Sequence, residues 1–117
     1  MRSKLFWTLS NTDKLTEALV KFRDERDWEQ FHNPKDLAIA LSLEASELLE
    51  TFLWKQPHEA DIEKIKEELA DVLAYALLIA KHYDLNVDDI VLKKIAQNAL
   101  KYPADKAKGN ATKYTDL

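Results

Sequence analysis

Two pairs of acidic residues are the part of this sequence whose spacing could do chemistry. Glu44 and Glu47 form the first pair, Glu68 and Asp71 form the second, and the members of each pair are three residues apart. On an α-helix, positions i and i+3 share a face, so both acids of a pair project in the same direction. Two such helices lying antiparallel would therefore direct four carboxylates at one small volume.

The residue types of this cluster indicate which ligand would stabilise it. Carboxylates gathered against apolar surroundings repel one another, and removing each of them from water is costly. Di-iron sites in helical bundles use Glu-x-x-His pairs, whereas Glu47 and Asp71 stand three residues after Glu44 and Glu68. An all-oxygen set favours Mg2+, with Mn2+ as an alternative. Because magnesium often shares its coordination with substrate phosphates, the sequence predicts a phosphorylated substrate.

The composition limits the fold and excludes several classes of function. The chain has 117 residues, enough for one domain, with one glycine, three prolines and no cysteine. So little glycine disfavours sandwiches and barrels and favours an all-α fold. The absence of cysteine excludes disulfides and zinc–thiolate sites. The net charge of −4, without a basic stripe, argues against nucleic acid as a partner. No apolar run suits a signal peptide or a membrane span, so we expect a cytoplasmic protein.

The predicted helices follow from apolar periodicity and from local start and stop signals. We expect an N-terminal arm (residues 1–11), a helical domain (residues 12–102) and an extended C-terminal tail (residues 103–117). Asn33 before Pro34 and Asn86 before two aspartates are typical of helix N-termini. The sequence predicts four helices, at residues 12–28, 34–55, 61–83 (or from residue 59) and 86–102.

The third predicted helix has the strongest apolar repeat. Its stripe recurs at intervals of three and four residues and comprises Ile62, Ile65, Leu69, Val72, Ala76, Ile79 and Tyr83. Leu73, Leu77 and Leu78 widen the apolar arc beyond one stripe. Such a helix in so short a chain indicates burial against a second subunit. We therefore expect a four-helix bundle unit assembled as a homo-oligomer, either a dimer or a tetramer.

Several other residues are candidates for binding a nucleotide. One face of the fourth predicted helix carries Lys94, Asn98, Lys101 and Tyr102. This face could contact phosphate or sugar, although exposed lysines are more often simply solvated. Two tryptophans close to predicted loops could stack on a base, and a tyrosine flanks the second acidic pair. These are Trp28, Trp54 and Tyr75, with the loop histidine His32 as a further polar candidate. We interpret Phe22, Phe31 and Phe52 as core residues.

Together these residues resemble the MazG-like nucleotide pyrophosphohydrolase superfamily, and within it the dCTP pyrophosphatase type. The resemblance covers the chain from about residue 15 to its end. It is carried by residues 22–34 (FRDERDWEQFHNP), 44–47 (EASE), 52–55 (FLWK), 67–75 (EELADVLAY) and 113–117 (KYTDL). The chain departs from that type at Leu19, where a histidine is usual, and at Leu43 and Ser46, where glycines are usual.

The resemblance implies hydrolysis of a (deoxy)nucleoside triphosphate to the monophosphate and pyrophosphate, a house-cleaning activity with a possible preference for dCTP. By similarity, the two acidic pairs would hold Mg2+ and form the catalytic centre. Lys94, Asn98, Lys101 and Tyr102 match positions that contact the phosphates or the sugar. Trp28, Trp54 and Tyr75 match positions around the base and sugar.

Two other classes of function remain open at this point. A non-catalytic helical interaction or regulatory module would use the acidic pairs as surface or interhelical polar contacts. A related phosphohydrolase could act on a different phosphate ester. Neither the base nor the sugar preference follows from the sequence, nor does the acid that positions the attacking water, for which Glu47 and Glu68 are the candidates.

Overall fold

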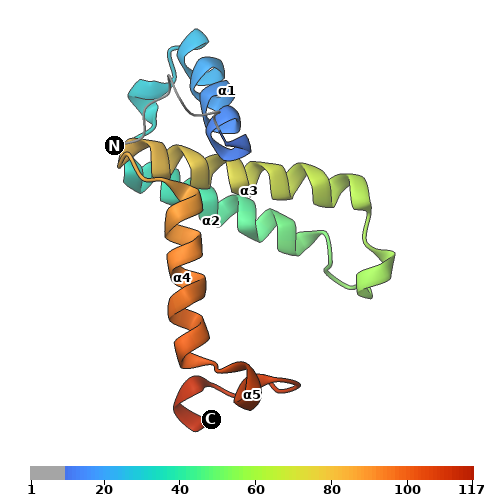
Figure 1. The fold of residues 1–117 in the computed structure, drawn as a ribbon. Helices are drawn as coiled ribbons and strands as arrows, with labels where there is room; N and C mark the ends of the chain where they lie inside the picture. Colours follow the sequence, from blue (N-terminus) through green and yellow to red (C-terminus); the bar gives the residue numbers. More distant parts are fainter. Residues whose placement is uncertain (1–9) are drawn as a thin grey trace. The chain divides into compact units, whose positions relative to one another are not determined.

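The computed structural model of the protein describes residues 10–117, and its described residues form helices and no strands (Figure 1). The all-α prediction is confirmed. The prediction for residues 1–9 of the arm lies outside the described residues. The chain divides into two units, Met1–Leu85 and Asn86–Leu117.

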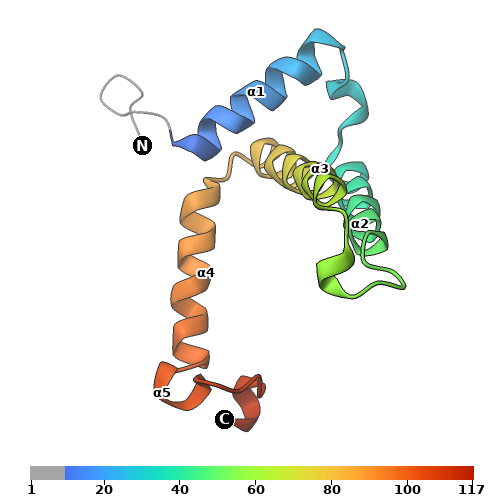
Figure 2. The ribbon, with the colours of Figure 1, turned by 90° about the vertical axis from the view of Figure 1, so that its right-hand side faces the viewer.

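The first unit contains three long helices and two short 3₁₀ turns. They are α1 (Asn11–Glu25), η1 (Glu29–Phe31), α2 (Pro34–Glu50), η2 (Pro57–Glu59) and α3 (Ile62–His82). Helices α2 and α3 lie side by side and run in opposite directions (Figures 1 and 2). Helix α1 packs against α3. This antiparallel pair is what brings the two acidic pairs of the sequence together.

The starts of these helices are set by local hydrogen bonds. The Ser10 hydroxyl accepts the Asp13 N–H at 3.1 Å, and the Asp13 carboxylate accepts the Ser10 N–H at 3.4 Å. The predicted cap at Asn33 is confirmed, since its side-chain oxygen accepts the Asp36 N–H at 2.9 Å. Such caps contribute about 1 kcal/mol each. The Ser10 cap starts α1 at Asn11, one residue earlier than expected.

Two predicted helices are shorter than expected at their C-terminal ends. Helix α1 was expected to reach Trp28 but ends at Glu25, because Asp27 adopts a left-handed backbone with φ 54°. Helix α2 was expected to reach Lys55 but ends at Glu50. The Thr51 hydroxyl donates to the Leu48 carbonyl at 2.7 Å, and Trp54 is left-handed with φ 62°. A left-handed residue is incompatible with the continuation of a right-handed α-helix.

The buried core of the described chain is small. Only Leu37 on α2 and Leu77, Leu78 and Ala80 on α3 are buried among the described residues. Six large apolar side chains of these two helices are at least two-fifths exposed: Ile39, Leu43, Leu49, Ile62, Leu69 and Leu73. On α3 the exposed members recur at i, i+7 and i+11 and so share one face. We call Ile62, Leu69 and Leu73 the uncovered stripe.

The second unit consists of α4 (Val87–Lys101), α5 (Ala104–Ala107) and η3 (Tyr114–Asp116). The predicted cap of α4 is confirmed, since the Asn86 side chain accepts the Asp89 N–H at 3.0 Å. Within residues 103–117 the chain forms α5 and η3, and Tyr114 returns to the end of α4. Its ring lies edge-on to Tyr102 at 5.9 Å, and the Lys101 ammonium lies 4.9 Å from its centre. Aromatic and cation–π contacts stabilise this return.

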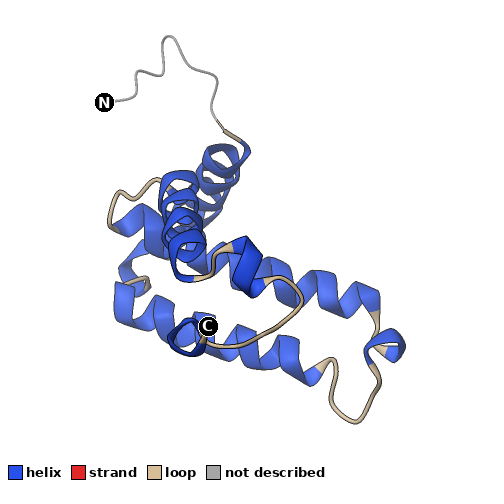
Figure 3. Cartoon of the chain, turned by 60° about the horizontal axis from the view of Figure 1, so that its bottom comes forward, coloured by secondary structure: helices blue, strands red, loops and turns tan. Residues whose placement is uncertain are grey.

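Helices and loops of the described chain are distinguished in Figure 3. Among residues 10–117, none of the helices combines the length and the apolar character needed to cross a membrane.

Candidate functional site

The acids of α2 and α3 converge where the two helices face each other. One carboxylate oxygen from each of Glu44, Glu68 and Asp71 lies within 4.8 Å of the other two. The Glu47 carboxyl lies close enough to both Glu44 and Glu68 to raise the pKa of each. We call these four residues the acidic cluster. The two helices thus bring together all four acids that the i and i+3 spacing singled out.

The proximity of these acids changes their protonation. The Glu47 carboxyl, burial and the charges of Glu47, Asp71 and Glu68 together raise the pKa of Glu44 from 4.5 to about 7. Burial is the largest cause raising the pKa of Glu68, followed by the Glu47 carboxyl. The pKa of the Tyr75 hydroxyl is raised by burial and by the charge of Glu44. The cluster therefore holds more negative charge than its surroundings stabilise.

Two oxygens of the cluster show what ligand would fit. Glu44 Oε2 and Glu68 Oε2 are buried, and neither has a hydrogen-bond partner among the described residues. Buried polar atoms without partners are rare in proteins and point to a bound water or ion. Carboxylate oxygens gathered in this way are hard ligands for a divalent cation. Glu44, Glu68 and Asp71 could therefore hold a metal ion together.

A pocket of about 410 Å³ opens on one side of the cluster. Asp71 belongs to both the pocket and the cluster, and Tyr75 stands one helical turn further along α3. We call it the aromatic pocket; its lining residues are Leu19, Phe22, Arg23, Trp28, His32, Asp71, Ala74, Tyr75 and Leu78. The buried Nδ1 of His32 has no hydrogen-bond partner among the described residues. Aromatic rings with a few polar atoms suit a planar heterocycle.

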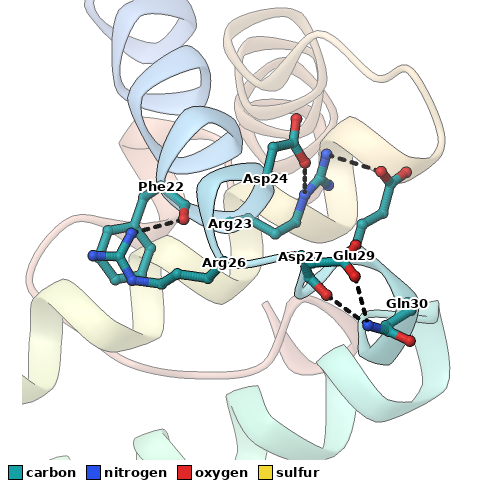
Figure 4. A network of polar contacts seen from close by, with 7 residues as sticks. All are labelled: Phe22, Arg23, Asp24, Arg26, Asp27, Glu29 and Gln30. Atoms are coloured by element: carbon teal, nitrogen blue, oxygen red, sulfur yellow. Dashed lines mark hydrogen bonds and ion pairs between the residues drawn. The ribbon is translucent and has the colours of Figure 1, made fainter.

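The corner after α1, which carries Trp28, is held by polar contacts (Figure 4). The left-handed Asp27 reverses the chain. The carbonyl and the carboxylate of Asp27 accept hydrogen bonds from the Gln30 side-chain amide at 2.9 and 3.1 Å. The Trp28 N–H donates to the Arg23 carbonyl at 3.1 Å. The Trp28 ring then packs edge-on against Phe22 with centroids 5.7 Å apart.

Two arginines brace the same corner (Figure 4). Arg26 lies over the Phe22 ring at 3.7 Å and donates to the Phe22 carbonyl at 2.9 Å. The mostly buried Arg23 pairs with Asp24 at 3.0 Å and with Glu29 at 3.7 Å. These contacts hold Phe22 and Trp28 at the mouth of the aromatic pocket.

A second depression, of about 390 Å³, lies on the other side of the cluster. Glu47 and Glu68 belong to both the cluster and this depression. We call it the polar groove; its lining residues are Glu47, Glu50, Thr51, Lys55, Asp61, Lys64 and Glu68. The acidic cluster thus lies between an aromatic pocket and a polar groove.

The predicted site residues fall into three groups. The four acids are brought together with Trp28, His32 and Tyr75 in the first unit. Trp54 is not, because its side chain is 98% exposed and lines neither the aromatic pocket nor the polar groove. The remaining candidates are exposed and belong to the second unit, on α4 and its C-cap: Lys94, Asn98, Lys101 and Tyr102.

Sequence reasoning missed several residues around the acids. Phe22 was interpreted as a core residue, but it is 48% exposed and lines the aromatic pocket. Phe31 was interpreted in the same way and is 63% exposed. Two of the missed residues could have been found from their spacing, since positions i and i+4 share a helix face. Lys64 lies four residues before Glu68, and Thr51 lies four residues after Glu47. Arg23 had no such signal, because its position depends on how α1 packs against α3.

Comparison with known proteins was informative at the level of sequence and of fold. A sequence model of the MazG-like family matches residues 39–117. The dCTP pyrophosphatase 1 of Mus musculus is 39% identical over 106 residues, covering 84% of this chain and 62% of that protein. The Homo sapiens protein of the same name is also 39% identical over 106 residues, with the same coverage of 84% and 62%. The chain therefore spans about three-fifths of the length of these relatives.

One solved structure is similar to this chain over nearly the whole length of the solved chain. A pyrophosphatase from Archaeoglobus fulgidus superimposes with a TM-score of 0.73 at 34% sequence identity. The match covers 86% of this chain and 99% of the other. At this identity and overlap, the likeness supports the all-α fold.

Proposed function

The chain belongs to the MazG-like family, and from this premise we propose that it is a Mg2+-dependent nucleoside triphosphate pyrophosphohydrolase. The observation that carries the proposal is the acidic cluster, with its two unpartnered buried oxygens, set between an aromatic pocket and a polar groove. The names of the relatives and of the structural neighbour point to the same chemistry. Mn2+ has the same preference for oxygen ligands and should substitute.

The reaction proposed is in-line displacement at the α-phosphorus. Water attacks that phosphorus, the bond to the oxygen bridging the α- and β-phosphates breaks, and pyrophosphate leaves. Glu44, Glu68 and Asp71 would hold Mg2+, which when bound supplies charge neutralisation to the triphosphate and makes water more acidic. We assign the orientation of the attacking water to Glu47, because it is exposed and close enough to Glu44 and Glu68 to raise the pKa of both. The aromatic pocket would fix the base.

The substrate class proposed is the deoxynucleoside triphosphates, in a house-cleaning role, with dCTP as the first candidate. The curated relatives named as dCTP pyrophosphatases support this choice. Base preference is set in the aromatic pocket, which in this chain includes Leu19 and His32. Lys94, Asn98, Lys101 and Tyr102 of α4 are proposed as further phosphate or sugar contacts, and Trp54 as a stacking residue.

A panel of natural and modified triphosphates, incubated with Mg2+ and resolved by ion-exchange chromatography, tests the proposal. Nucleoside monophosphate and pyrophosphate in equal amounts, with no product after chelation of the metal, are expected. Diphosphate with inorganic phosphate would instead indicate a different phosphohydrolase. No turnover, together with no metal-dependent nucleotide binding, would indicate a non-catalytic module.

Replacing Trp28 by alanine is expected to raise KM more than it lowers kcat. Stacking of an aromatic side chain on a base is worth about 1–3 kcal/mol, or roughly 5- to 150-fold in binding. Steady-state kinetics on the best substrate of the panel measures the change. Phe31→Ala is the matched control, since Phe31 is 63% exposed and outside the aromatic pocket. Equal KM values for the two variants would remove Trp28 from the base site.

We also propose self-association through the uncovered stripe of α3. Ile62, Leu69 and Leu73 are 59%, 43% and 54% exposed and share one face. Exposed contiguous apolar surface of this kind marks an interaction site. A second copy of the chain is the occupant that satisfies such a stripe symmetrically, since residues of a two-fold interface meet their own counterparts.

Leu73→Glu is expected to reduce the molar mass in solution from that of a dimer or tetramer toward 13.5 kDa. A charge placed in an apolar interface is strongly unfavourable without a partner. Size-exclusion chromatography with light scattering gives the mass, and Glu67→Gln on the same helix is the control. A wild-type mass of 13.5 kDa at every concentration would contradict self-association.

A further inference from the structure

We propose that the polar groove is the subsite for the leaving pyrophosphate, with Lys55 and Lys64 as its phosphate-binding residues. This inference rests on the proposed function and adds a direction to it. The base would lie in the aromatic pocket, the α-phosphate at the acidic cluster, and the β- and γ-phosphates in the groove. Lys55 entered the sequence analysis only as the last residue of the second predicted helix and of the FLWK stretch, and Lys64 did not enter it.

The order of side chains along α3 supports this direction. Lys64, Glu68, Asp71 and Tyr75 recur at i, i+4, i+7 and i+11, so they line one face of the helix. Lys64 lines the groove, Glu68 is shared by groove and cluster, Asp71 is shared by cluster and aromatic pocket, and Tyr75 lines the pocket. The axial rise of 1.5 Å per residue separates Lys64 from Tyr75 by about 16 Å. This separation matches an extended nucleoside triphosphate in scale.

The opposite side of the groove comes from α2 and the turn after it. Thr51 and Lys55 follow Glu47 along the chain, as the helix ends at Glu50. The left-handed Trp54 immediately precedes Lys55. The backbone of this turn therefore sets the position of the Lys55 side chain. Lys55 and Lys64 therefore enter one groove from two different elements.

The charges of the polar groove favour pyrophosphate that is bound as its magnesium complex. Lys55 and Lys64 form no ion pair among the described residues, although four acids line the same groove, whereas Lys66 pairs with Glu63 at 3.1 Å. Free pyrophosphate would be repelled by those acids. Magnesium-complexed pyrophosphate carries less negative charge, and the two ammonium groups supply donors to its outer oxygens. The groove should therefore select the metal complex.

The double variant Lys55→Ala/Lys64→Ala tests the subsite through product inhibition. We expect the inhibition constant of magnesium pyrophosphate to rise at least about tenfold, because two charge-assisted hydrogen bonds are lost. The inhibition constant of the nucleoside monophosphate should stay within about twofold. Lys66→Ala, on the same helix but paired outside the groove, should resemble the wild type in both. The single variants should each show part of the pyrophosphate effect.

Isothermal titration with magnesium pyrophosphate gives a second readout that needs no turnover. Weaker binding to the double variant, with normal circular dichroism, would support the subsite. Unchanged pyrophosphate binding, or equal losses for pyrophosphate and monophosphate, would overturn it. A wild-type protein that releases no pyrophosphate from any triphosphate would instead refute the proposed function, so the two failures are distinguishable.

Discussion

Asp71→Asn is expected to lower kcat by about a thousandfold or more while leaving the helical fold intact. The amide keeps the shape of the side chain but removes a negative oxygen ligand from the acidic cluster. In the cluster, a carboxylate oxygen of Asp71 lies within 4.8 Å of one from Glu44 and one from Glu68. Loss of metal-supplied charge stabilisation is worth several kcal/mol, and about 1.4 kcal/mol corresponds to tenfold in rate. Glu47→Gln should have a comparable effect on kcat because it removes the group assigned to the attacking water.

A pyrophosphate-release assay measures these rates, and circular dichroism reports the fold. Glu67→Gln is the matched control, since Glu67 precedes Glu68 on α3 but lies outside the cluster, the pocket and the groove. Near-normal turnover of the Asp71 or Glu47 variant would exclude that residue from the site. An equal loss in the Glu67 variant would show that the effect is not specific to the cluster.

The second large effect concerns pH. Mg2+ affinity is expected to fall about tenfold for each pH unit below about 7, because Glu44 must lose its proton to bind a metal and its pKa is raised to about 7. Because Glu44 is already half protonated at pH 7, the dissociation constant should rise by about fiftyfold between pH 7 and pH 5. Isothermal titration in buffers of different ionisation enthalpy measures both the affinity and the proton released. A constant affinity from pH 8 to pH 5 would contradict this assignment.

Protonation of Glu44 weakens Mg2+ binding, but in the metal-free protein it stabilises the folded state. Because the pKa of Glu44 is higher in the folded state than its ordinary value of 4.5, the folded state binds the proton more tightly. This contribution is fully present below about pH 4.5 and is lost as the pH rises through about 7. The increase in melting temperature on adding Mg2+ should consequently be larger at pH 8 than at pH 6. Glu44→Gln should reduce this difference.

The starts of the helices could be predicted from the sequence because their signals are local. Asn33 and Asn86 each satisfy a backbone N–H three residues ahead, an interaction within one turn of chain. The end of α1 depends on the left-handed Asp27. After Glu50 the backbone N–H groups bond three residues back instead of four, and this turn leads to the left-handed Trp54. A tryptophan does not indicate such a backbone in advance, and aspartate, although enriched there, is more often right-handed, so both helices were predicted too long.

The same contrast applies to the site. Glu44, Glu47, Glu68 and Asp71 could be found because i and i+3 spacing on two neighbouring helices is visible in the sequence. The aromatic pocket required knowledge of how α1 packs against α3, which places Phe22 and Arg23 beside Tyr75. Side chains that meet through packing between helices have no spacing rule in the chain itself. The polar groove similarly joins Lys55 of a turn to Lys64 of a helix.

Crystals of the protein grown with Mn2+ and a non-hydrolysable triphosphate analogue would test the central claim most directly. Anomalous scattering locates Mn2+ without reference to the protein chain. A peak within coordination distance of Glu44, Glu68 and Asp71, absent in crystals of the Asp71→Asn variant, is the predicted result. Mn2+ bound elsewhere, with the four acids directed into solvent and away from the phosphates, would contradict the metal-dependent mechanism.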